Sequence, residues 1–315
     1  MKNRFAVFAA LCGLFVLLWA APQAIASCRS GLTLCVDLIL PSLFPFFILS
    51  GLLNRLGLPA ELGKLLAPAA SLLFGVSGTG ASCFLFGLTG GYPLGAACIG
   101  DLLRKRCISE EEAGRLLAFC NNSGPAFLVG AIGSGVFGSS VIGLKLYGIH
   151  ALAAVLTGIL LRGKAAAAMP LRGEAPLSFS CALTESVRQA VSSLLNVCGF
   201  VVCFAVFTGL LEANGFYQAL ISPLSRLFRL EPAALRALLS GFFELGSGIG
   251  ALRGLPATPR NLALAAALVG WGGISVHFQS FAVLSDVKIK SAPLIAGRLA
   301  NAVFSYALAR LFFRI

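Results

Sequence analysis

Two short polar motifs lie inside long apolar stretches and carry side chains that could bind a solute. Residues 119–125 read Phe-Cys-Asn-Asn-Ser-Gly-Pro, which places Asn121, Asn122 and Ser123 in a row ahead of Gly124. Amide and hydroxyl groups need hydrogen-bonding partners where water is scarce, and a proline at a helix start frees backbone N–H groups. The motif therefore predicts a ligand site, with a hydrogen-bonded knot between helices as the alternative.

The second motif, Gly-Gly-Tyr-Pro-Leu-Gly-Ala at residues 90–96, combines flexible glycines with one aromatic side chain and a helix-starting proline. A helix that begins inside a membrane offers unpaired N–H groups and partial positive charge to an anion. Gly91 and Tyr92 are therefore candidate substrate-binding residues. A glycine-rich helix-packing site remains the alternative.

Glu244 lies in the apolar run of residues 241–249, and Asp37 is the only comparable acid. A carboxylate in such a run is costly unless it is protonated, paired or functional. Glu244 is a candidate for binding a proton or sodium ion for coupling, and a structural ion pair with an arginine such as Arg298 is the other interpretation.

A third polar group lies at residues 271–279, Trp-Gly-Gly-Ile-Ser-Val-His-Phe-Gln, where Ser275, His277 and Gln279 flank two glycines. These three residues complete the predicted binding set, although a lone histidine often has only a structural role. The chain has two histidines. With so few histidines we expect no metal site, and we separately expect no cofactor and no catalytic residues.

The elements that carry these residues must be membrane helices. Of 315 residues, 11% are charged and 58% are hydrophobic, and the mean hydropathy is +0.91. Ordinary soluble domains have roughly 25% charged residues, so a bilayer must cover much of the surface. The net charge is +12, and the lysine and arginine residues are scattered between apolar runs instead of forming one patch. This distribution favours lipid headgroups over nucleic acid as partners. The clearest predicted spans are residues 32–53, 139–161, 188–211, 262–283 and 293–313.

Glycine, proline and asparagine interrupt four other apolar stretches, at residues 65–100, 113–137, 233–252 and 270–279. Non-helical backbone at membrane depth is tolerated only where it is buried in protein or lines a water-filled cavity. We therefore predict an all-α polytopic integral membrane protein whose broken helices or re-entrant segments meet at the midplane.

The chain also shows weak internal similarity, which predicts two homologous halves. Ser-Gly-Leu-Leu at residues 50–53 matches Thr-Gly-Leu-Leu at residues 208–211, and the polar breaks recur in the same order. The predicted units are a first hydrophobic span or signal sequence at 1–27, repeats at 28–162 and 182–315, and a linker at 163–181. Analogy with transporters favours inverted repeats, with binding segments between the halves.

Five ordered motifs give the chain a resemblance to a known family: residues 41–47, 90–96, 119–125, 241–244 and 272–279. From about residue 30 onward it resembles the YlbJ-type sporulation integral membrane proteins, which belong with the nucleoside-recognition, or Gate, domains. The resemblance implies a helical fold with repeats, a bacterial cell or forespore membrane, and transport of the aromatic dicarboxylate dipicolinate. Gly246-Ser247 after Glu244 departs from the family pattern at the coupling-ion position.

The leading hypothesis is a secondary transporter for a small polar or anionic aromatic solute, such as dipicolinate or a nucleoside-like molecule. A non-transporting Gate-domain protein that serves as a structural or assembly partner in spore maturation is the alternative. No GxxxxGK[ST], GxSxG or HExxH motif occurs, so neither ATP drive nor hydrolase activity is expected. Membrane lipids and further copies of the chain are the other expected partners.

Overall fold

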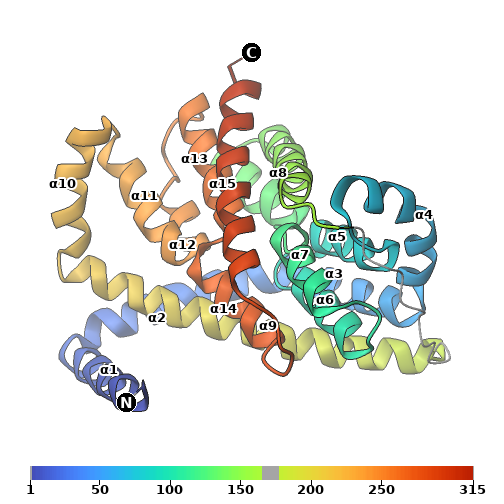
Figure 1. The fold of residues 1–315 in the computed structure, drawn as a ribbon. Coiled ribbons are helices and arrows are strands. Elements are labelled where there is room, and N and C mark those ends of the chain that lie inside the picture. The colour runs from blue at the N-terminus through green and yellow to red at the C-terminus, as the bar shows by residue number, and fades with distance from the viewer. Residues whose placement is uncertain (1, 165–176, 315) are drawn as a thin grey trace.

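The computed structural model describes residues 2–164 and 177–314, and within them the chain is helical (Figure 1). The helices of the N-terminal part are α1 (Lys2–Trp19), α2 (Ala21–Leu34), the π-helix η1 (Cys35–Ile39), α3 (Leu40–Arg55), α4 (Leu58–Phe74), α5 (Gly78–Gly90), α6 (Leu94–Arg104), α7 (Glu110–Cys120), the π-helix η2 (Ala126–Val136) and α8 (Ser140–Leu160). The C-terminal part contains α9 (Phe179–Ala213), α10 (Phe216–Phe228), α11 (Pro232–Phe243), α12 (Leu245–Gly250), α13 (Pro259–Trp271), α14 (Gly273–Val283) and α15 (Ala292–Phe312).

The predicted interruptions are confirmed as helix ends. Helix α5 stops at Gly90 and α6 begins after Pro93, while α7 stops at Cys120 and η2 follows Pro125. In the second part, α11 ends before Glu244 and α13 ends before Gly272. Proline and glycine act here as local helix breakers, which is why the sequence alone located them.

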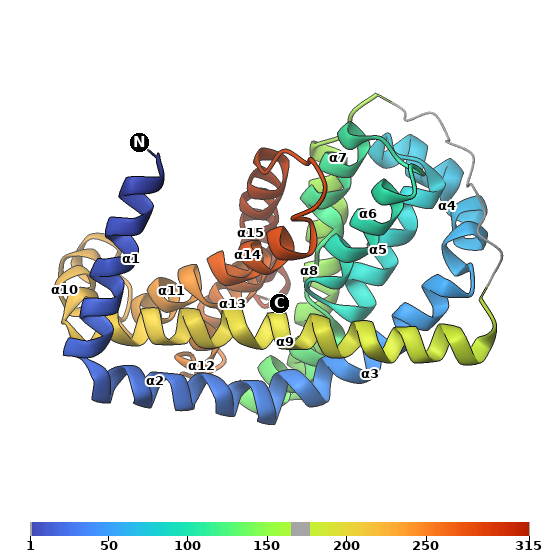
Figure 2. The same cartoon turned by 90° about the horizontal axis from the view of Figure 1, so that it is seen from below.

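Two long helical segments lie side by side and run in opposite directions (Figure 2). Helices α2, η1 and α3 follow one another without a gap from residue 21 to residue 55, and α9 alone covers Phe179–Ala213. Their apolar side chains, including Cys35, Phe47, Leu194 and Val197, form one buried cluster. This pair forms one wall of the molecule, on which the shorter broken helices pack.

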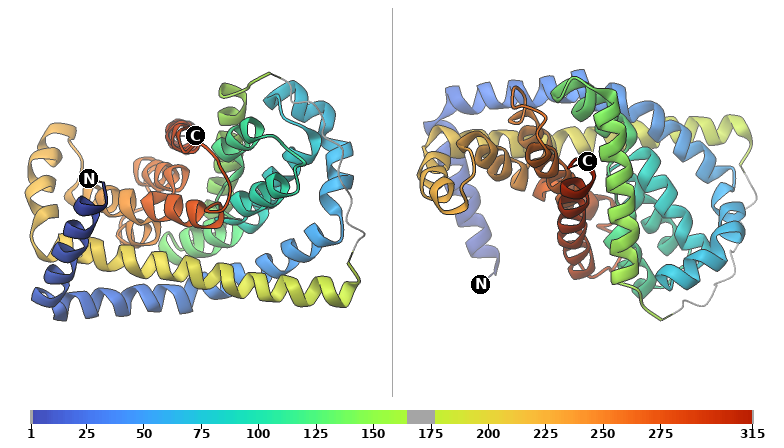
Figure 3. Two further views of the ribbon diagram at one scale, coloured as in Figure 1. Left: turned by 60° about the horizontal axis from the view of Figure 1, so that its bottom comes forward. Right: turned by 90° about the horizontal axis from the view of Figure 1, so that it is seen from above.

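Helix α15 packs against α7, α8 and α13 (Figure 3). A Cβ atom at Gly270 would lie 2.7 Å from the Ala302 backbone, and one at Gly297 would touch the backbone of Ala118. Small residues at helix contacts let backbones approach closely inside membranes. Arg298, Asn301 and Ser305 on α15 are consequently buried.

Within the described residues, four helical segments are long and apolar enough to cross a membrane: Ser140–Leu160, Phe179–Ala213, Pro259–Val283, which comprises α13 and α14, and Ala292–Phe312. Two bent pairs raise that number to six if each pair forms one span, Ala10–Trp19 with Ala21–Ile39 at 98° and Glu61–Phe74 with Gly78–Gly90 at 91°. A multi-pass helical fold with bent and broken segments is thus confirmed. Of the predicted linker 163–181, residues 165–176 lie outside the described residues, and residues 179–181 belong to α9.

Candidate functional site

The two helix breaks of the N-terminal part touch each other through their glycines. Gly91 has φ +80° and ψ −175°, a conformation open essentially to glycine alone. A Cβ atom at Gly91 would lie 3.0 Å from the Gly124 nitrogen, and one at Gly124 would lie 3.1 Å from the Gly91 nitrogen. The Gly-Tyr-Pro and Asn-Asn-Ser-Gly segments, separate in sequence, are therefore one structural unit.

The breaks of the C-terminal part meet in the same way. Gly273 has φ +80°, and a Cβ atom there would lie 3.0 Å from the Leu245 nitrogen at the start of α12. Glu244, 3% exposed, caps α12 by accepting hydrogen bonds from the backbone N–H groups of Gly246 and Ser247. A carboxylate at a helix start satisfies N–H groups that would otherwise lack partners.

Hydrogen bonds across the molecule join these two units. The Tyr92 hydroxyl donates to the carbonyl oxygen of Val269 at 2.7 Å. The Asn121 amide donates to the Ser280 hydroxyl at 2.7 Å. All four breaks are consequently tied together, although they come from residues almost 200 positions apart.

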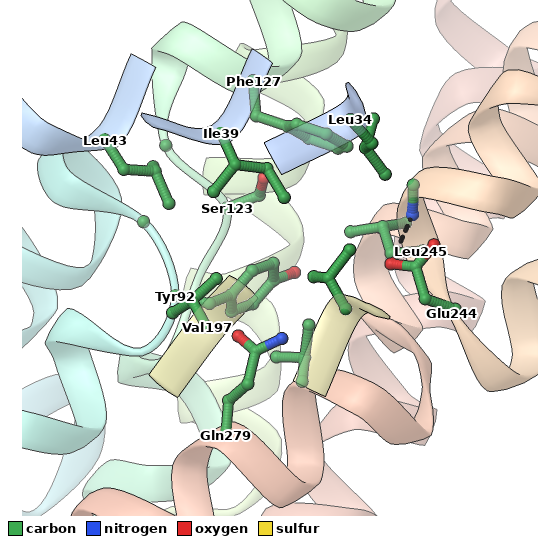
Figure 4. A pocket seen from close by; sticks show the side chains of 15 residues that line it. Leu34, Ile39, Leu43, Tyr92, Ser123, Phe127, Val197, Glu244, Leu245 and Gln279 are labelled. Carbon is green, nitrogen blue, oxygen red and sulfur yellow. Dashed lines mark hydrogen bonds between the residues drawn. The ribbon is translucent and has the colours of Figure 1, made fainter. Parts of the chain in front are cut away.

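A cavity of about 60 Å³ lies where the breaks converge. Its wall contains apolar side chains from the long helices, among them Leu34, Ile39, Leu43 and Val197, and polar groups from the breaks (Figure 4). A single water needs roughly 10–15 Å³ by this measure, so the space accommodates a few waters. It is a narrow, mostly apolar pocket with a few convergent polar groups, as small-molecule sites commonly are.

The structure brings together six of the ten predicted site residues around this cavity. They are Gly91, Tyr92, Ser123, Gly124, Glu244 and Gln279. Sequence reasoning did not identify the apolar lining residues Phe127, Val201, Leu245 and Val276. Nothing in the local pattern distinguishes these from any other apolar residue of a membrane helix, so no sequence signal could have found them.

The other four predicted residues lie beside the cavity, buried in protein. Asn121 is bonded to Ser280 as above, and the Asn122 amide donates to the Phe119 carbonyl at 2.7 Å. Ser275 accepts a hydrogen bond from Gln279, and His277 Nδ1 lies 2.7 Å from the Gly273 carbonyl oxygen. These contacts support the backbone of the breaks and the position of Gln279.

Glu244 and Arg298 do not form a salt bridge with each other in the described structure. The Arg298 guanidinium instead lies over the Tyr92 ring, 5.0 Å from its centroid. Arg298 is 1% exposed, and its Nη1 is 3.4 Å from the Gly270 carbonyl oxygen. An arginine inside a predicted span was the available signal. Sequence reasoning named it as a possible partner for Glu244 and favoured neutral donors over an arginine clamp for the solute.

A second cavity of about 570 Å³ adjoins the first and shares Leu34, Phe127 and Gly246 with it. Asp37 and Arg253 line this wider space, together with small residues of η2 and α12. Of these two adjoining cavities, the second is the larger. Within residues 2–164 and 177–314, no group of three or more His, Cys, Asp and Glu side chains is arranged to hold a metal ion.

The sequence is 30% identical over 311 residues to the sporulation integral membrane protein YlbJ of Bacillus subtilis (strain 168). The match covers 90% of this chain and 76% of that protein. The chain belongs to the YlbJ family. It is thus a multi-pass integral membrane protein related to a bacterial sporulation protein, and the resemblance seen in its motifs is confirmed. No protein-family model matches the chain.

Proposed function

We propose that this YlbJ-family protein is a secondary transporter that carries a small polar or anionic aromatic solute through the central cavity. Dipicolinate uptake during sporulation is the specific role we propose, and the protein acts without enzymatic chemistry. The observation that carries this proposal is the convergence of four helix breaks on one cavity with a buried carboxylate, Glu244, at its wall. Broken helices around a buried site are the usual arrangement in transporters.

The order of the helices supports two repeated halves of the Gate type. Gly57 and Gly215, both with positive φ, precede α4 and α10 after the two long helical segments. Then α5 and α11 end at the first break of each half, and α7 and α13 end at the second. The opposite directions of α9 and α2–α3 fit repeats of inverted topology (Figure 2).

The sizes of the two cavities support a site that must open during transport. The central cavity accommodates only a few waters in this conformation, and we propose that its apolar wall moves away from the breaks when a ring with two carboxylates enters. The adjoining cavity of about 570 Å³ offers a route from which a solute could enter. Leu34 and Phe127 line both spaces and would form the gate between them.

Uptake of radiolabelled dipicolinate into proteoliposomes tests the proposal. We expect the wild-type protein to accelerate uptake over empty liposomes, and Leu34→Trp to block it by filling the cavity. Leu72→Trp is the matched control, because Leu72 is 67% exposed on α4 and lines none of the cavities described above. Uptake by the wild-type protein that stays at the level of empty liposomes, across proton and sodium gradients, would overturn the transporter assignment.

The second candidate function is a structural or assembly role in spore maturation. The membership in a sporulation family favours it as directly as it favours transport. The two are separated by complementation of a sporulation-deficient relative: the assembly role predicts that Leu34→Trp restores spores as well as the wild-type protein does.

A further inference from the structure

Arg298 is the most deeply buried cation of the described structure, and one edge of its guanidinium has no partner. Its Nε and Nη2 atoms are buried and make no hydrogen bond within the described residues. The same edge of Arg104 holds the carboxylate of Asp286 through two hydrogen bonds of 2.8 Å. Nε and Nη2 form the fork that matches a carboxylate, so Arg298 presents an unfilled carboxylate-binding edge.

The surroundings of Arg298 do not neutralise its charge. Its contacts are the Tyr92 side chain, through both the ring and the hydroxyl group, and the Gly270 carbonyl oxygen, and no salt bridge to it occurs in the described structure. A buried charge without a counter-charge carries a large desolvation cost. Such a residue inside a membrane protein marks a solute or ion site more often than a structural contact.

Two further buried donors in this part of the core lack partners. Asn301, one helical turn from Arg298 on α15, accepts a hydrogen bond from Ser305, but its Nδ2 is unpaired. The Ser123 backbone N–H donates to His150 Nε2 at 3.1 Å, so Nε2 is an acceptor and neutral His150 carries its proton on Nδ1. That Nδ1 is also buried and unpaired.

We propose that Arg298 is the anion-recognition residue of this protein and that its free Nε/Nη2 edge binds a carboxylate group of the solute. This inference rests on the proposed transport function and assigns the residue that recognises a carboxylate of the proposed solute. Tyr92 lines the cavity, and the Arg298 guanidinium lies over the face of the Tyr92 ring. Arg298 itself does not line the cavity in this conformation, so binding requires the Tyr92 side chain to move aside and open a path to the fork.

Equilibrium binding to purified protein in nanodiscs tests the inference without any transport assay. The probes are dipicolinate and its neutral diamide, which keeps the ring and removes both charges. We expect the wild-type protein to bind dipicolinate at least about tenfold more tightly than the diamide, because charge-assisted bidentate hydrogen bonds are the strong ones. Equal affinities would overturn the proposal even if no variant could be purified.

Arg298→Gln should reduce dipicolinate affinity at least about tenfold and leave the weak affinity for the diamide unchanged. Arg298→Lys keeps the charge but not the fork, and its affinity should lie between the two. Arg310→Gln is the matched control, because Arg310 lies on the same helix and is only half-buried. Unchanged dipicolinate affinity in folded Arg298→Gln would overturn the assignment.

A chloride titration distinguishes a free halide from the solute carboxylate as the occupant of the fork. If chloride competes with dicarboxylate in the wild-type protein and not in Arg298→Gln, both anions use this edge, which supports the site. If chloride raises the melting temperature of the wild-type protein while dicarboxylate neither binds nor displaces it, the edge is a halide site and the carboxylate assignment is wrong. Failure of uptake with intact dicarboxylate binding would instead refute the transporter proposal and leave the anion site standing.

Discussion

Gly91 and Gly124 lie backbone against backbone at the centre of the molecule, with the Gly91 nitrogen 3.1 Å from the position of a Cβ atom on Gly124. This contact joins the end of α5 to the segment that precedes η2. A side chain at either position would crowd the opposite backbone, so the two breaks would have to shift apart. The geometry of the site therefore depends on the absence of a Cβ atom at both Gly91 and Gly124.

Gly91→Ala should destabilise the folded protein by about 2–4 kcal/mol, because it combines a conformation that alanine rarely adopts with a close contact. Gly148→Ala is the control, since Gly148 lies within α8 and a Cβ atom there meets nothing within 4 Å. That control should be neutral or stabilising by up to about 1 kcal/mol. The measurement is thermal unfolding in detergent, and similar melting temperatures for both variants would contradict the packing described here.

The sequence predicted these breaks well, because glycine, proline and asparagine act on the backbone within a few residues of themselves. It predicted the residues that line the cavity less well. Leu34 and Val197 reach the cavity from long apolar helices, and their place there depends on how those helices cross the rest of the fold. Tertiary contacts of this kind leave no local pattern.

The sequence also did not separate the polar residues that line the cavity from those with a structural role. Asn122 and Ser123 are neighbours in one motif, yet Ser123 lines the cavity and Asn122 caps the end of α7 through the Phe119 carbonyl. Sequence reasoning assigned both to the substrate, since composition does not reveal which way a side chain points once the helix has ended.

Cysteine labelling separates these positions in a variant that lacks the ten native cysteines. Ser123→Cys and Gln279→Cys line the cavity and should react with a small methanethiosulfonate reagent that enters through the wider space. Ser275→Cys should remain protected, because Ser275 lies outside the cavity lining. Equal labelling of all three positions in folded protein would show that the breaks are arranged differently.

The contact between Arg104 and Asp286 predicts a pH dependence outside the membrane-spanning helices. Two hydrogen bonds from the Arg104 guanidinium lower the pKa of Asp286 from 3.8 to about 2. A carboxyl group whose pKa is lower in the folded protein stabilises the fold above its unfolded pKa and loses that effect as the pH falls through the folded value. The contribution is therefore complete above about pH 4 and disappears toward pH 2.

Asp286→Asn removes this contribution at neutral pH, where the variant should melt slightly below the wild-type protein. The effect is small because solvent screens this exposed pair. As the pH is lowered from 5 toward 2, the two melting temperatures should converge, while the control Glu61→Gln, at an exposed helical ion pair, should follow the wild-type protein closely throughout. A difference that widens on acidification would refute the assigned linkage.

Glu244 has a structural role that the sequence did not reveal and a coupling role that we propose. As the cap of α12 it accepts two backbone hydrogen bonds. Glutamine keeps one acceptor oxygen, so Glu244→Gln should cost about 1 kcal/mol, whereas Glu244→Ala leaves both N–H groups unpaired and should cost about 2 kcal/mol or more. The half-exposed Glu212, paired with Arg236 at 2.9 Å, provides the control substitution Glu212→Gln, with little expected effect.

The coupling role is measured on the same variants in proteoliposomes. Because glutamine can neither bind a proton nor offer a charge to sodium, Glu244→Gln should abolish gradient-driven accumulation of the solute while the folded protein persists. Exchange of labelled for unlabelled solute, which needs no net ion movement, should survive in Glu244→Gln if the cavity itself is intact. If Glu244→Gln accumulates solute like the wild-type protein but melts at a lower temperature, the Glu244 carboxylate is a helix cap and has no coupling role. Asp37, which lines the adjoining cavity, would then be the next candidate for the coupling group.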